Sequence, residues 1–270
     1  MKHQTIKPSL AQLPESFAIL VDNIKAISVT GEEANKYLQG QLTCDVDQLA
    51  EKHLLVGGHC DAKGKMFAAF RLINHFEQRL MIQSESSIAA SLKELQKFGV
   101  FAKVDIKQAD DLAYLALCGP ASVEFIQQTF SSVPDALTPV VQKGNVSVIY
   151  VCGATNRYLI VGSQATIFDL AESTNLDILP SQVWTLLEIQ SGFVHLNEQA
   201  VSHYVPQMVN LQHVNGISFT KGCYLGQETV ARMKYLGRNK KALFALQSSG
   251  DAKWQLDADL ENGLTLEKQI

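Results

Sequence analysis

Long apolar stretches, clustered cysteines and an excess of basic residues are all missing from this chain of 270 residues. The fullest apolar run, Ser147–Cys152, is too short to cross a bilayer. The 5 cysteines contain no Cys-x-x-Cys pair and the 7 histidines no His-x-x-x-His pair, so no metal site is expected. The net charge of −4 argues against a general nucleic-acid binder, so direct nucleic-acid binding is not expected.

These absences favour a cytoplasmic protein with free thiols and no membrane partner. Met1–Leu20 lacks the apolar core and small-residue cleavage site of a signal peptide. Cys44, Cys60, Cys118 and Cys152 lie in apolar segments, where a buried, inert thiol is the ordinary expectation. A hydrophobic content of 46% allows a sizeable core, and the length predicts two compact units or one elongated assembly.

The first half of the chain has an α+β pattern. Thr30 is placed to cap a helix, with Glu33 three residues later as a capping-box partner, and Gly40 ends that helix. The other predicted elements are a strand at 24–29, a hairpin of 54–60 and 66–73, a short strand at 80–83, a helix at 87–98 and a half-buried strand at 100–107.

The second half repeats this type of pattern with different residues. The predicted elements are a strand at 112–118, a helix at 119–130, a loop at 131–143, paired strands at 146–152 and 157–161, and helices at 166–172 and 181–191. Strand–helix–strand–strand–helix is a ferredoxin-like order. The stretch 194–216 is rich in His, Asn and Gln and looks irregular, and irregular stretches of this length are often functional.

The densest chemistry follows at residues 219–228. Cys223 lies two residues after Lys221, between two glycines and just before a helix predicted for Gln227–Met233. A lysine and a helix N-terminus both stabilise a thiolate, so Cys223 is a candidate catalytic thiol and Lys221 the residue that tunes it. Glu228 could orient the lysine or bind a ligand. The alternative is a turn with an incidental cysteine.

The whole string Lys221-Gly-Cys-Tyr-Leu-Gly-Gln-Glu228 resembles the signature of the YgfZ folate-binding proteins, relatives of the aminomethyltransferase (T-protein) of glycine cleavage. Three other segments resemble that family in the same order along the chain: Tyr37–Thr43, His59–Met66 and Pro206–Leu211.

The resemblance implies a T-protein-like fold with ferredoxin-like subdomains around a central folate-sized opening and a truncated C-terminal β-barrel. The implied domains are 1–110, 111–215 and 216–270, and they are expected to interleave. It also implies tetrahydrofolate or a derivative as cofactor and iron–sulfur tRNA-modifying enzymes as partners, in support of tRNA methylthiolation. The folate-contact positions that it implies are Trp184, Gln190, Tyr224, Glu228, Asp61 and Lys63.

Three departures keep alternatives open. Ile24 stands where the family has a tryptophan, Gln190 stands where it has a glutamate, and only Thr229–Ile270 remains for the barrel. A scaffold that has lost folate, or Trp184 as a plain core residue, is therefore a second interpretation. A tetrahydrofolate-dependent aminomethyltransferase is less favoured, since the stretch 83–90 contains no aspartate to manage protons. Whether the protein is an enzyme in the classical sense stays open.

A basic segment follows the signature. Residues 229–250 contain no acidic residue and five basic ones, namely Arg232, Lys234, Arg238, Lys240 and Lys241. Such a segment is either a solvated face or a patch that steers a polyanion, such as the tail of a polyglutamylated folate, toward the signature loop.

Overall fold

The computed structural model describes residues 13–153, 156–237, 241–245 and 264–266. The chain divides into two compact units. Unit 1 combines Met1–Asp22 with Asp111–Ser191, and unit 2 combines Asn23–Asp110 with Gly192–Ile270. Each unit is thus assembled from two separate stretches of chain. The predicted boundaries of three domains remain a prediction.

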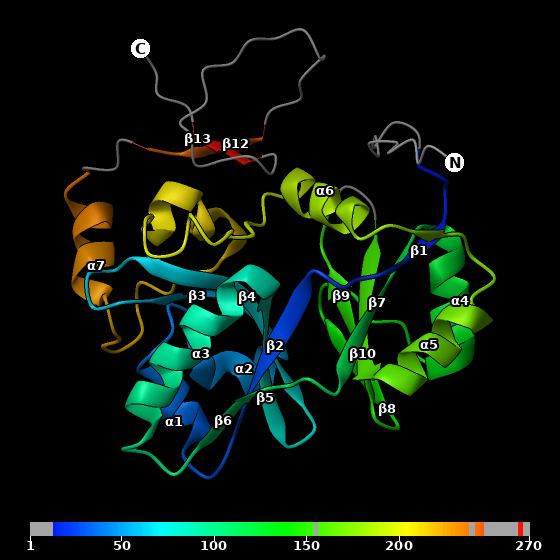
Figure 1. Ribbon diagram of the computed structural model, residues 1–270, viewed down its shortest axis with the longest axis horizontal. Coiled ribbons are helices and arrows are strands. Elements are labelled where there is room, and N and C mark those ends of the chain that lie inside the picture. Colours follow the sequence, from blue (N-terminus) through cyan, green and yellow to red (C-terminus); the bar gives the residue numbers. More distant parts are fainter. Residues whose placement is uncertain (1–12, 154–155, 238–240, 246–263, 267–270) are drawn as a thin grey trace, which may run out of the picture. The chain divides into compact units, whose positions relative to one another are not determined.

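Unit 2 is built on a five-stranded antiparallel sheet in the order β3-β4-β5-β2-β6. Its strands are β2 (Ile24–Thr30), β3 (Leu54–Cys60), β4 (Met66–His75), β5 (Gln78–Ser84) and β6 (Asp105–Gln108). Helices α1 (Ala34–Gln39), α2 (Leu49–Lys52) and α3 (Glu85–Gly99) pack on one face of this sheet (Figure 1). The buried face of α3 carries Ile88 and Leu95 at helical spacing, as the sequence predicted.

The irregular stretch after Gly192 covers part of the opposite face of the unit 2 sheet. Phe193, Leu211 and Val230 pack there against strand residues such as Cys60 and Met66. The segment contains two short 3₁₀ turns, at 206–209 and 211–214, and then helix α7 (Gln227–Tyr235). The sequence prediction of an irregular segment followed by a helix is therefore confirmed.

Unit 1 is built on a six-stranded sheet in the order β11-β1-β7-β10-β9-β8. Its strands are β1 (Phe17–Leu20), β7 (Leu112–Cys118), β8 (Val140–Lys143), β9 (Val146–Val151), β10 (Arg157–Ser163) and β11 (Ile178–Leu179). Helices α4 (Pro120–Phe130) and α5 (Gln164–Ser173) share one core with alternate strand residues. Helix α6 (Gln182–Gln190) contacts Arg157, which points to the other face of β10.

The predicted α+β fold class is confirmed. In both units three consecutive antiparallel strands stand between the helices, β3-β4-β5 in unit 2 and β8-β9-β10 in unit 1, which is one strand more than the ferredoxin-like order has. In unit 1 the N-terminal strand β1 lies between β7, to which it is antiparallel, and β11, to which it is parallel. Strands β12 (Leu243–Ala245) and β13 (Leu264–Leu266) pair with each other. No closed barrel occurs in the described ranges, and the central opening remains a prediction. No helix in the described part of the chain is long and apolar enough to span a membrane.

One strand prediction and one loop prediction were wrong. The strand predicted for 100–107 begins only at Asp105, because the preceding residues form turns in which Val100 and Phe101 are 73% and 88% exposed. The loop predicted for 131–143 ends in strand β8, which pairs with β9. The N-terminal strand β1 was not predicted, because four apolar residues show no period of their own.

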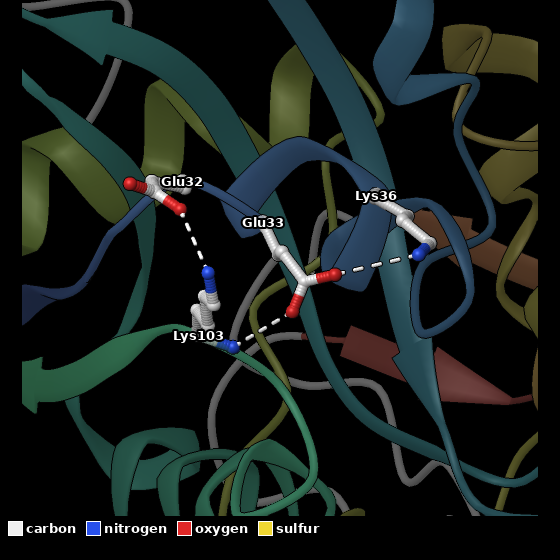
Figure 2. A network of polar contacts seen from close by, with 4 residues as sticks. All are labelled: Glu32, Glu33, Lys36 and Lys103. Atoms are coloured by element: carbon white, nitrogen blue, oxygen red, sulfur yellow. Dashed lines mark hydrogen bonds and ion pairs between the residues drawn. The ribbon is translucent and has the colours of Figure 1, made fainter.

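The predicted capping box at Thr30 is also wrong. Helix α1 begins at Ala34, so Glu33 occupies the N-cap position, and no side chain caps the helix. Figure 2 shows what Glu33 does instead: its carboxylate accepts a hydrogen bond from the main-chain N–H of Lys103 at 2.9 Å and pairs with Lys36 at 3.3 Å. The Lys103 N–H is the main reason that the pKa of Glu33 is lowered. Glu33 thus ties the turn before β6 to the start of α1.

Candidate functional site

Main-chain hydrogen bonds join two segments of unit 2: the turn at residues 39–44, called the early turn below, and the loop at residues 216–226, called the signature loop. The N–H of Leu225 donates to Gly40 O at 3.0 Å, and the N–H of Ser218 donates to Thr43 O at 2.8 Å. The hydroxyl of Thr43 donates to Gly216 O and accepts from the N–H of Gly58 at 2.7 Å. The Thr43–Gly216 bond joins residues that are 173 positions apart in the sequence. These two distant segments therefore form one hydrogen-bonded layer.

Lys221 stands at the centre of this contact. Its Nζ donates to the main-chain carbonyls of Gln39 at 2.7 Å, Leu42 at 2.9 Å and Cys44 at 2.7 Å. The ammonium also lies 5.1 Å from the centre of the Tyr224 ring. Burial lowers the pKa of Lys221 to about 8, against the opposing charges of nearby acidic groups. Its predicted role as tuner of the Cys223 thiol stays a prediction.

The hairpin turn at Asp61–Lys65 packs against the start of α7. The Asp61 carboxylate accepts the N–H groups of Lys63 and Lys65, both at 2.8 Å, which shapes the turn. Gly64 and Gly226 meet so closely that a Cβ on Gly226 would lie 2.8 Å from the Cα of Gly64. The Lys63 side chain is exposed beside this turn.

Gly226→Ala is expected to destabilise the protein by about 1–3 kcal/mol. Gly226 has a φ of +83°, and a Cβ there would lie 2.5 Å from Asp61 O. Gly222→Ala is the matched control: within the described part of the chain its Cβ would meet nothing within 4 Å. Urea unfolding of both variants checks the prediction, which equal midpoints would contradict.

The fourth motif segment, Pro206–Leu211, reaches the same place. Gln207 Nε2 donates to Val230 O in α7 at 2.6 Å, and Leu211 packs so close to Gly58 that a Cβ there would lie 2.9 Å from its Cδ2. All four segments singled out in the sequence therefore meet in unit 2. Their separation along the chain hid this contact. Three of the four segments contain glycine, a residue that allows close main-chain approach, and this was the one available signal.

Cys223 is exposed on the loop that these contacts hold. Tyr224 beside it is buried, and burial raises the pKa of its hydroxyl. Glu228 is exposed and pairs with Arg232 at 2.7 Å, one helical turn later, a surface contact worth about 0.3–0.5 kcal/mol. Cys152 is exposed as well, so the expectation of a buried thiol was wrong there and right for the other three predicted positions.

The remaining predicted contact residues lie in unit 1, on α6. Trp184 is fully buried, and its Nε1 has no hydrogen-bond partner among the described residues. Gln190, at the end of the helix, is exposed. The stacking role of Trp184 and the pterin contact of Gln190 therefore stay predictions.

The sequence prediction missed the most buried charged groups, which also lie beside Trp184. Arg157 and Glu188 form an ion pair at 3.1 Å with side-chain exposures of 1% and 0%. The Arg157 guanidinium lies 5.2 Å from the Trp184 ring and donates to Ser191 Oγ at 3.0 Å. One signal was present: Glu188 falls one helical turn after Trp184, on the apolar face of α6.

The basic segment after the signature is only partly described. Arg238 and Lys240 lie outside the described residues. Lys234 is exposed, with its Nζ 3.6 Å from the centre of the Phe219 ring, and Lys241 is exposed as well. Within the described ranges, no group of three His, Cys, Asp or Glu side chains could hold a metal ion.

Comparisons with known proteins place the chain in a family. The tRNA-modifying protein YgfZ of Colwellia psychrerythraea is 56% identical over 257 residues, which cover 95% of this chain and 79% of that protein. The tRNA-modifying protein YgfZ of Vibrio vulnificus is 40% identical over 240 residues, or 88% and 72% of the two chains. No family model matches the sequence.

A solved structure shares the fold. The glycine cleavage system aminomethyltransferase T from Bartonella henselae superimposes with a TM-score of 0.64 at 16% identity, over 85% of this chain and 65% of that one. This likeness shows a T-protein-like fold and nothing of its chemistry. Together with the identity to the curated relatives, it means that the chain belongs to the YgfZ family of tRNA-modifying proteins.

Proposed function

We propose that this chain binds tetrahydrofolate or a derivative in the cytoplasm and supports iron–sulfur-dependent tRNA modification, with Cys223 as its reactive thiol. The observation that carries the proposal is the convergence of the four motif segments of unit 2 on the loop of Cys223. A thiol held at the surface by a hydrogen-bonded frame is accessible and oriented, as a nucleophile or sulfur carrier requires.

The folate part of the proposal has separate support. Membership of the YgfZ family and the T-protein-like fold both favour a folate ligand. In unit 1, the Trp184 indole has an unsatisfied N–H among the described residues, next to a buried carboxylate and guanidinium. An indole can stack on a flat ring, a contact worth about 0.5–1.5 kcal/mol beyond area burial. Because the Trp184 ring is fully buried, stacking requires that the ligand displace side chains that now cover it. The scaffold that has lost folate is the competing proposal.

Calorimetric titration with tetrahydrofolate tests the folate part. We expect saturable binding that weakens about 10-fold in Trp184→Phe, because the smaller ring has no N–H and stacks over less area. Phenylalanine is preferred because Trp184→Ala would empty a fully buried site at a cost of about 3–5 kcal/mol. Phe168→Ala, an exposed aromatic residue of α5, is the control and should bind normally. No heat of binding in the intact protein would favour the scaffold.

Alkylation tests the role of Cys223. The described part of the protein has two exposed thiols, Cys152 and Cys223. The alkylation rate of Cys152 therefore serves as an internal reference for the rate of Cys223. With iodoacetamide and site-resolved mass spectrometry, we expect Cys223 to react faster than Cys152 at neutral pH. Saturating tetrahydrofolate should slow only Cys223. Equal rates at both thiols, unaffected by folate, would contradict a functional thiol.

A further inference from the structure

Lys221 is the group on which the frame of the signature loop depends. An ammonium has three hydrogens, and three main-chain carbonyls accept them at 2.7–2.9 Å. Gln39 is the last residue of α1, whose final carbonyls have no partner within the helix. A cation is favoured at this end of a helix dipole, so Lys221 completes α1 as well as its own loop.

The charges around Lys221 support the same arrangement. Asp45 and Asp47 act on the ammonium, and both favour its charged form. Both carboxylates also accept the side-chain N–H groups of Gln39, at 2.7 and 3.1 Å, which fixes the segment that Lys221 contacts. The thiol of Cys44, at the far end of that segment, is fully buried, and burial raises its pKa to about 12, so it remains a neutral packing residue.

We infer that Lys221 is a positioning residue, which clamps the carbonyls of Gln39, Leu42 and Cys44 and thereby holds the loop of Cys223 in place. It acts on the thiol through the main chain and does not act as an electrostatic neighbour of the sulfur. The inference rests on the proposed function only in taking Cys223 as the functional group, and the clamp itself is measurable without it.

Hydrogen exchange measures the clamp directly. Lys221→Met keeps roughly the length of the side chain and removes its donors. The neighbouring bonds from Ser218 N to Thr43 O and from Leu225 N to Gly40 O are then no longer supported by the bonds of the ammonium. We expect both amides to exchange at least about 10-fold faster. Each lost hydrogen bond to the charged ammonium contributes about 1.5–3 kcal/mol, and about 1.4 kcal/mol already corresponds to a factor of ten. Lys234→Met is the control, because among the described residues Lys234 contacts the rings of Phe219 and Tyr235.

The pH profile of Cys223 alkylation separates a clamp from an electrostatic tuner. If Lys221 acts as a clamp, the midpoint of the profile in Lys221→Met stays within about half a pH unit of the wild type. The reason is that the lost ammonium was bound to the three carbonyls and did not interact with the sulfur. A midpoint displaced upward by about one unit or more with unchanged exchange would overturn the inference in favour of a tuner. Unchanged exchange with an unchanged midpoint would overturn it as well.

Lys221→Arg keeps the test decisive if Lys221→Met does not fold. A planar guanidinium cannot direct three hydrogens at carbonyls that converge on one point, although it keeps the charge. We expect intermediate exchange at Ser218 and Leu225 with an unchanged midpoint. Full protection in Lys221→Arg would show that only the charge matters and would contradict the clamp. Failure of Cys223 to react in the wild type would instead count against the proposed function alone.

Discussion

Glu188→Leu is expected to destabilise unit 1 by about 3–5 kcal/mol. Its carboxylate pairs with Arg157 at 3.1 Å, and neither side chain is more than 1% exposed. The variant removes the negative charge of Glu188 from beside a buried guanidinium, in a site of low dielectric constant. The measurement is urea unfolding at neutral pH, followed by the circular dichroism of the protein.

The double variant Arg157→Met, Glu188→Leu is the control for that result. Replacing both ends of a buried pair by apolar side chains of similar volume is often neutral or stabilising. We therefore expect the double variant to recover most of the lost stability. A double variant as unstable as Glu188→Leu would mean that Arg157 acts through its other donors, to Cys152 O at 3.3 Å and Ser191 Oγ at 3.0 Å.

Acid is expected to destabilise unit 2 through His59. This side chain is fully buried, with its Nδ1 2.9 Å from Ser91 Oγ, and burial lowers its pKa to about 3. In the unfolded chain a histidine has a pKa of about 6.5. Between these two values the unfolded state binds the extra proton, so stability falls as pH falls from about 6.5 toward 3.

The expected size of this effect is about 2 kcal/mol between pH 8 and pH 5, and roughly 4 kcal/mol by pH 3. Urea unfolding across that range measures it. His59→Gln should remove this contribution, while His213→Gln, at an exposed histidine, should keep the wild-type pH dependence. Equal acid losses in the wild type and His59→Gln would show that other groups cause them.

Both predictions concern charged or titratable groups whose burial the sequence pattern did not reveal, although His59 begins one of the four motif segments. A glutamate in an apolar helix and a histidine in an apolar strand have no local signal for burial, because burial depends on what packs against them. Arg157 begins a strand 31 residues before Glu188, and Ser91 lies 32 residues after His59. Contacts between residues distant in the sequence bury these groups, and burial makes the stability of the fold depend on their charge.

Local periodicity and turn chemistry were sufficient for most elements. The sequence by itself determined the hairpin of β3 and β4, the apolar face of α3, the irregular segment after Gly192 and the helix α7, because each depends on neighbours in the chain. It also determined the family, since four short motifs in a fixed order are specific as a set.

Only the tertiary structure decided how these pieces combine. It placed β1 beside β7, shortened the strand predicted from Val100, and moved Glu33 from a capping box to the N–H of Lys103. It also placed the ammonium of Lys221 where it donates hydrogen bonds to three carbonyls of the early turn. The physical reason is common to all four: an unpaired strand edge, carboxylate, ammonium or carbonyl takes the partner that folding brings near, and no local pattern encodes which one that is.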